Sequence, residues 1–93
     1  MDNEGLQELS TLTQLTWLSL SDSGVTGVGL WRLRGLTRLT KLYLDDCDGV
    51  TDVDIRELSS LSALNHLSLY NCHTSKAGRN ALKAAIPGLT IDC

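Results

Sequence analysis

A short leucine motif recurs along this 93-residue chain and constrains its fold more than any other feature. The segments Leu15–Leu20, Leu39–Leu44 and Leu64–Leu69 all read L-x-x-L-x-L, at spacings of 24 and then 25 residues. The residues between the motifs also correspond, because Val25, Val28, Leu30, Leu33 and Leu36 match Val50, Val53, Ile55, Leu58 and Leu61. A period of this length indicates stacked units, each of which buries its apolar face against the next.

Each unit has two halves with different periods. Leu18 and Leu20 alternate with polar neighbours, which is typical of a strand with one buried face. Leu30, Leu33 and Leu36 recur every three residues, as on one side of a helix. Strands that alternate with helical crossovers predict an α/β fold with a parallel sheet.

Helix starts can also be located. Thr51 and Asp54 resemble a capping box, with Asp in the place of the usual Glu. Ser75 can cap a last helix that Pro87-Gly88 would end. We therefore expect a single domain over 1–93. It would consist of a half repeat 1–14 with Leu6, Leu9 and Leu12, repeats at about 15–38, 39–63 and 64–86, and a closing strand 87–93.

The best-matching unit, Leu39–Leu61, reads L-x-x-L-x-L-x-x-C and then V-T-D-x-x-I-x-x-L. It resembles the cysteine-containing leucine-rich repeat of ribonuclease-inhibitor-like proteins and of the substrate-recognition regions of F-box proteins. The first repeat has Ser23 where this family has Cys, and the third has Cys72 but lacks V-T-D. The resemblance spans about Leu6–Asp92. It implies a right-handed β/α solenoid with the sheet on the concave face and the helices on the convex face.

Composition and charge narrow the partners. The net charge is −3 and the basic residues are interspersed with acids, which argues against nucleic-acid binding. No apolar run approaches the ~18 residues of a membrane span. The N-terminus is acidic with no hydrophobic run after it, unlike a secretory signal. Three cysteines form no complete disulfide framework, so we expect a reducing, cytoplasmic location.

Residues that could carry chemistry do not converge. Cys47 and Cys72, one repeat apart, are interpreted as small buried residues, although stacked positions on neighbouring strands would allow a disulfide. The acidic segment 45–54 fails the EF-hand pattern at both ends. A zinc site from His66, Cys72 and His73 would need side chains from opposite faces of a strand. We predict no enzyme, metal or cofactor.

The outward strand positions are the candidate binding residues, and three of the four aromatic residues are among them. Aromatic anchors among small polar groups are typical of recognition surfaces. The predicted partner-binding residues are Trp17, Ser19, Lys41, Tyr43, Asp45, His66, Ser68 and Tyr70, in a row that Ser21, Thr90 and Asp92 would extend.

These positions predict a protein–protein interaction module that binds through the concave face. The alternative for Trp17 is that it shields the open N-terminal end of the core, while Trp31 would cover the convex surface or meet a second partner. Two alternatives remain for the whole chain. It could be a structural piece that self-associates through open solenoid ends, or a substrate-recognition fragment of a larger receptor such as a ubiquitin ligase.

Overall fold

A computed structural model describes residues 9–21 and 24–93, which form a four-stranded parallel sheet with helical segments. The strands follow one another in chain order, and the predicted α/β class and parallel sheet are confirmed. The register aligns Leu18, Leu42, Leu67 and Ile91 across the sheet. The strands are β1 (Trp17–Ser19), β2 (Lys41–Tyr43), β3 (His66–Ser68) and β4 (Thr90–Asp92).

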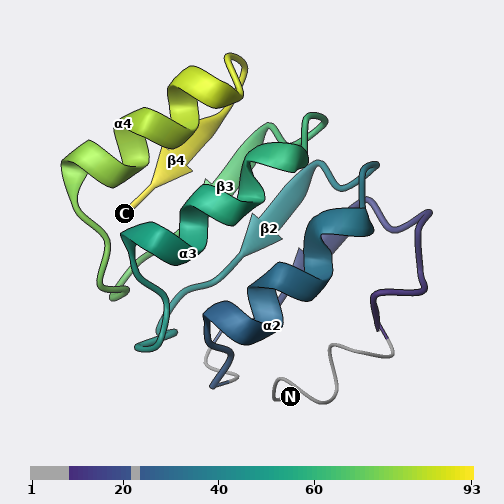
Figure 1. Cartoon of the computed structure of the whole chain (residues 1–93), viewed down its shortest axis with the longest axis horizontal. Helices are drawn as coiled ribbons and strands as arrows, with labels where there is room; N and C mark the ends of the chain where they lie inside the picture. Colours follow the sequence, from purple (N-terminus) through teal and green to yellow (C-terminus); the bar gives the residue numbers. More distant parts are fainter. Residues whose placement is uncertain (1–8, 22–23) are drawn as a thin grey trace.

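The helical segments lie side by side along one face of the sheet (Figure 1). The other face, here called the open face, is covered by none of the helices within residues 9–21 and 24–93. The α-helices that follow β1 and β2 have five residues each and continue as 3₁₀ turns. In a 3₁₀ helix, residues three apart eclipse each other, which explains why the apolar residues recur every three positions. The segments are α2 (Gly27–Trp31), η1 (Arg32–Gly35), α3 (Asp52–Arg56), η2 (Glu57–Ser60) and α4 (Lys76–Ala85).

One core of stacked leucines lies between the sheet and the helices. The inward residues of the central strand segment, Leu42 and Leu44, are fully buried, and so are Leu33 and Leu58 in the 3₁₀ turns. Leu9 and Leu15 are only partly buried against this core, while Leu12 is 50% exposed. Leu6, which the half repeat includes, lies outside the described residues.

The turns after β2 and β3 repeat the same backbone conformation. Asp46 and Asn71 both adopt a positive φ, 59° and 60°, and the Asn71 Nδ2 donates a hydrogen bond to Asp46 Oδ1 at 2.8 Å. Asp and Asn tolerate this left-handed conformation better than other residues with side chains. The polar residue types at these positions therefore follow from the geometry of the turn.

The cysteines link each turn to the preceding strand. The Cys47 thiol donates to the Leu20 carbonyl at 3.3 Å, and the Cys72 thiol donates to the Leu44 carbonyl at 2.9 Å. Cys47 is fully buried as expected, whereas Cys72 is only partly buried. Ser23, at the corresponding position of the first repeat, lies outside the described residues.

All three cysteines are thiols, and we predict that they react at very different rates. Cys93 is exposed, Cys47 is buried, and burial raises the pKa of the Cys72 thiol, which lowers its thiolate fraction. Titration of the native protein with Ellman's reagent should modify Cys93 first, then Cys72, and Cys47 last. The unfolded protein, in which all three should react together, is the control. Equal reaction rates of the three thiols in the native protein would contradict the burial of Cys47 and the partial burial of Cys72.

Hydrogen bonds at the helix starts match the predicted caps. Thr51 and Asp54 form the capping box, in which Asp54 Oδ2 accepts the Thr51 backbone N–H at 2.9 Å. Ser75 Oγ accepts the Gly78 N–H at 3.2 Å. The Asp52 carboxylate accepts hydrogen bonds from the Ser75 hydroxyl at 2.6 Å and from the Ser75 N–H at 2.7 Å. The hydrogen bond from the hydroxyl is the largest cause that holds the pKa of Asp52 below its ordinary value. Asp52 therefore ties the start of α3 to the start of α4.

This close approach predicts that Gly78→Ala destabilises the fold. A Cβ at Gly78 would overlap the Asp52 carboxylate, whereas a Cβ at Gly35 would meet no atom within 4 Å. We expect Gly78→Ala to cost about 1–3 kcal/mol through overpacking. Gly35→Ala should be neutral or slightly stabilising, because alanine restricts the unfolded chain. Thermal melts of both variants would test this, and equal melting temperatures would contradict the contact between α3 and α4.

Candidate protein-binding surface

The parallel register brings the predicted binding residues together on the open face. Trp17, Lys41, His66 and Thr90 are register partners in one row across the four strands. Ser19, Tyr43, Ser68 and Asp92 are partners in the next row, and Asp45 and Tyr70 follow where β2 and β3 end. Each strand is three residues long, so within residues 9–21 and 24–93 each strand contributes two outward residues to these rows.

An aromatic row crosses the first three strands. The ring centroids of Trp17 and Tyr43 lie 5.6 Å apart, and those of Tyr43 and His66 lie 5.5 Å apart, both with tilted planes. These distances lie in the range of favourable aromatic pairs. Each ring contact is diagonal across the sheet. Tyr43 is in register with Ser19 and Ser68, whereas Trp17 and His66 are in register with Lys41. Trp17 remains 55% exposed, whereas Tyr43 and His66 are partly buried beside it.

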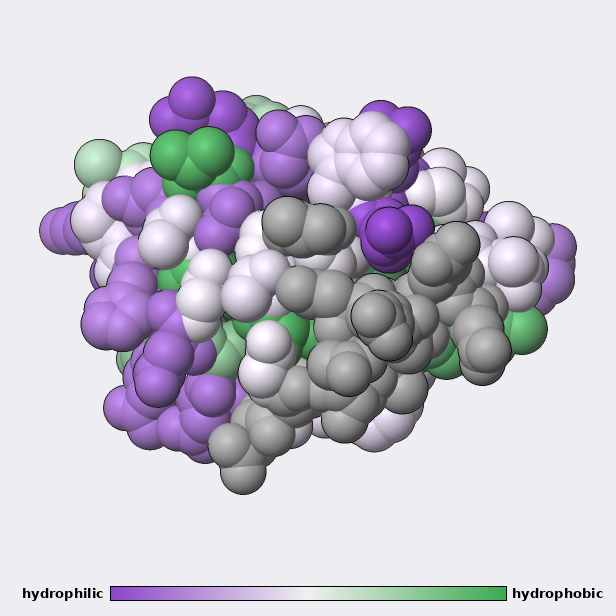
Figure 2. Space-filling model, turned by 60° about the horizontal axis from the view of Figure 1, so that its bottom comes forward, coloured by the Kyte–Doolittle hydropathy of each residue, from purple (hydrophilic) through white to green (hydrophobic). Residues whose placement is uncertain are grey.

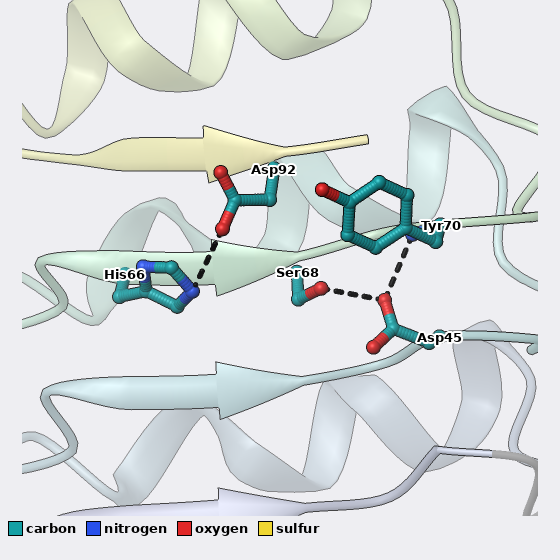
Figure 3. A network of polar contacts seen from close by, with 5 residues as sticks. All are labelled: Asp45, His66, Ser68, Tyr70 and Asp92. Carbon is teal, nitrogen blue, oxygen red and sulfur yellow. Dashed lines mark hydrogen bonds and ion pairs between the residues drawn. The ribbon is translucent and has the colours of Figure 1, made fainter.

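Two aspartates lean toward β3 from the strands on either side of it (Figure 3). From β2, Asp45 Oδ1 accepts the Ser68 hydroxyl at 2.6 Å and the Tyr70 backbone N–H at 2.8 Å. From β4, Asp92 Oδ2 lies 3.1 Å from His66 Nε2, an ion pair when the imidazole is protonated. The Asp45 N–H in turn donates to Ser21 Oγ at 3.1 Å. Polar contacts on the open face thus connect each strand to the next across the sheet.

The predicted residues differ in how accessible they are. Trp17 and Tyr70 are about half exposed, at 55% and 49%, whereas Ser68 is only 3% exposed. Ser68 occupies an outward position, but its hydroxyl donates a hydrogen bond to Asp45. The Ser68 side chain is therefore a buried part of the surface that holds the Asp45 carboxylate in place. Sequence reasoning places Asp92 only as an extension of the row, and its contact with His66 depends on the pairing of β4 with β3.

Charge is unevenly distributed along the strands. Asp45, Asp46 and Asp48 follow β2 in the turn, and Asp92 ends β4, whereas Lys41 stands at the start of β2. In Figure 2, many of the side chains at the left end of the molecule, the end at which the strands finish in Figure 1, are hydrophilic. Acidic residues therefore gather at and just after the ends of β2 and β4.

The helix side carries two features of its own. The Trp31 ring is 46% exposed, and the Arg34 guanidinium lies 3.6 Å from its centroid, in a cation–π contact. A groove of about 280 Å³ runs between α3 and α4. The groove was not predicted from the sequence. The one sequence feature that indicates it is the series of alanines at 77, 81 and 85 along α4, whose small side chains line the groove without filling it.

Among the described residues, no group of three or more His, Cys, Asp or Glu side chains could hold a metal ion. No helix in that part of the chain is long and apolar enough to cross a membrane.

The chain is similar to F-box/LRR-repeat protein 12 of Arabidopsis thaliana, at 38% identity over 88 residues. The match covers 88% of this chain and 22% of the relative, so the chain spans about a fifth of that protein's length. No protein-family model matches the chain. The similarity and the parallel sheet are compatible with leucine-rich repeats.

Proposed function

We propose that this chain is a leucine-rich-repeat module that binds another protein through its open sheet face. The observation that carries the proposal is the aromatic row of Trp17, Tyr43 and His66, which stands on the open face, opposite α2, α3 and α4. Trp17 is 55% exposed and Tyr43 and His66 are partly exposed beside it, and aromatic side chains supply contact area at a low cost in conformational entropy. Exposed apolar patches on a protein surface commonly mark sites where another protein binds.

The units stack as a solenoid of the cysteine-containing class, with the open face concave. Three observations support this assignment. The strands pair in chain order with an unshifted register, the thiols of Cys47 and Cys72 both donate to the preceding strand, and both turns use a left-handed Asp or Asn. The same interactions thus recur at one-repeat intervals, as in a repeat array whose units contact only their neighbours. The domain and repeat boundaries then follow those predicted from the sequence.

Within a longer protein, the module would recognise substrates for a receptor such as a ubiquitin ligase. The similarity to an F-box/LRR-repeat protein supports this role. The acidic strand ends favour a protein partner over nucleic acid, and reduced thiols suit a cytoplasmic location. A second candidate is self-association through β1 and β4, the two outer strands, since outer strands offer backbone groups for pairing.

Affinity capture with matched variants tests the proposal. The wild-type chain and a Trp17→Ala/Tyr43→Ala variant would be used as baits, with bound proteins identified by mass spectrometry. Val53→Ala is the control, because Val53 is 65% exposed on the helix side. Partners held by the wild type and the control but lost by the aromatic variant would support the open face. Retention by all three baits would refute it, and a concentration-dependent mass in sedimentation would favour self-association.

A further inference from the structure

The groove on the helix side lies between α3 with η2 and α4, which are neighbours along that side of the sheet (Figure 1). Its volume is about 280 Å³, and the buried Leu82 and the alanines at 77, 81 and 85 give it an apolar lining. Ala77 and Ala81 are exposed, so a partner can reach the groove from solvent. Pockets for whole small molecules usually measure roughly 300–1,000 Å³. The groove therefore has room for one large side chain rather than for a larger ligand.

Two opposite charges border the groove, and the fold engages them unequally. Both oxygens of the Asp52 carboxylate accept a hydrogen bond from Ser75, one from its N–H and the other from its hydroxyl. Arg56 is exposed, and no carboxylate of residues 9–21 and 24–93 lies within ion-pair distance of its guanidinium. Arg56 is also the smallest of the causes that lower the pKa of Asp52, of which the Ser75 hydroxyl is the largest. The charge that the groove offers to a partner is therefore the cation of Arg56.

The preceding repeat shows what packs against a guanidinium at this level of the helix side. Trp31 and Arg56 each end a five-residue helix, and Arg34 and Ser59 are each the third residue of the 3₁₀ turn that follows. In the first pair, the Arg34 guanidinium lies 3.6 Å from the centroid of the Trp31 ring. In the second pair, Arg56 and Ser59 both line the groove, and none of the residues that line it is aromatic. The groove thus has a guanidinium but lacks the ring that the preceding repeat carries.

We propose that the groove between α3 and α4 receives an aromatic side chain of a partner protein, with an acidic residue next to it in the partner's sequence. The ring lies against Ala81 and Leu82 and stacks on the Arg56 guanidinium, whose N–H groups bind the neighbouring carboxylate. A guanidinium can do both at once, because its donors lie in its plane and its face is free to stack. This contact surface lies on the opposite side of the sheet from the open face, so the inference goes beyond the proposed function.

A peptide titration followed by NMR tests the groove. The probe is a blocked peptide of glycines with a central tryptophan followed by glutamate, and two control peptides replace the tryptophan by alanine or the glutamate by glutamine. The reporters are the backbone amides of Ala77 and Ala81. We expect the probe to shift both amides, the glutamine peptide to bind about tenfold more weakly, and the alanine peptide to cause no shift. Equal binding of the three peptides, or no shift of these two amides by the probe, would overturn the proposal.

Two leucine variants of α4 locate the binding site. Ala81→Leu fills the groove, and Ala84→Leu is the matched control, because Ala84 is exposed on the same helix but does not line the groove. Both are expected to fold, since both positions are exposed and leucine is a good helix former. Ala81→Leu should abolish the shifts caused by the probe, whereas Ala84→Leu should preserve them. Probe binding that is unchanged in Ala81→Leu, or lost equally in both variants, would contradict the groove.

Arg56→Gln tests the charge separately from the apolar lining. It should weaken the glutamate probe by about tenfold and the glutamine peptide by less, because only the former loses an ion pair. Equal losses for the two peptides would contradict the contact between Arg56 and a carboxylate. Trp17→Ala/Tyr43→Ala, which changes the open face, should bind the probe as the wild type does. The outcome at the groove is therefore distinguishable from that of the proposed function.

Discussion

Leu44→Ala should leave much of the chain unfolded at physiological temperature. Leu44 is fully buried and follows the central strand β2, with an equivalent leucine one repeat away on either side, Leu20 and Leu69. Truncation of a buried leucine typically costs ~2–5 kcal/mol, because it removes transfer free energy and leaves a cavity. A small domain has a total stability of only about 5 kcal/mol. Urea and thermal unfolding, monitored by circular dichroism, would measure the loss.

Leu12→Ala is the matched control, since the same atoms are removed from a side chain that is 50% exposed. We expect a loss well under that of Leu44→Ala, because half of the Leu12 side chain already faces water and little cavity forms. A larger loss for Leu12→Ala would mean that the segment before β1 carries more of the stability than its exposure indicates. The account of a core centred on β2 would then be wrong.

Tyr43→Ala should have the largest effect of any single substitution on partner binding. Tyr43 is the only member of the aromatic row in ring contact with both Trp17 and His66 among the described residues, so its removal divides the surface in two. Truncation of an aromatic anchor commonly costs about 2 kcal/mol or more, which corresponds to about 30-fold in affinity. Calorimetry with an identified partner would measure the change.

Tyr43→Phe separates the ring from its hydroxyl. It keeps the contacts with both neighbours, so we expect affinity within a few-fold of the wild type. Tyr43→Ala should lower the melting temperature less than Leu44→Ala does, because Tyr43 is only partly buried on the open face and lies outside the leucine core. A Tyr43→Ala variant that folds normally and binds the partner with unchanged affinity would show that the open face is not the binding surface.

The leucine repeat shows most clearly how much of the fold could be predicted from the sequence. The spacing of the L-x-x-L-x-L motifs predicted three parallel strands in register, because a strand exposes alternate residues and equal units stack equally. The caps at Thr51 and Ser75 were also predictable, since capping depends on residues only three positions apart. The one-turn α-helices that continue as 3₁₀ turns were not resolved from the sequence, since a three-residue spacing suits both helix types.

The amino-acid sequence by itself determined which residues lie on each face of the sheet, because side-chain direction alternates along a strand whatever lies nearby. Tertiary structure alone decided how those residues meet. The diagonal ring contacts of Tyr43, the burial of Ser68 beneath its neighbours and the approach of Asp92 to His66 all join residues from different strands. Such contacts depend on register and side-chain rotamers, which packing sets jointly across the sheet and which no single segment encodes.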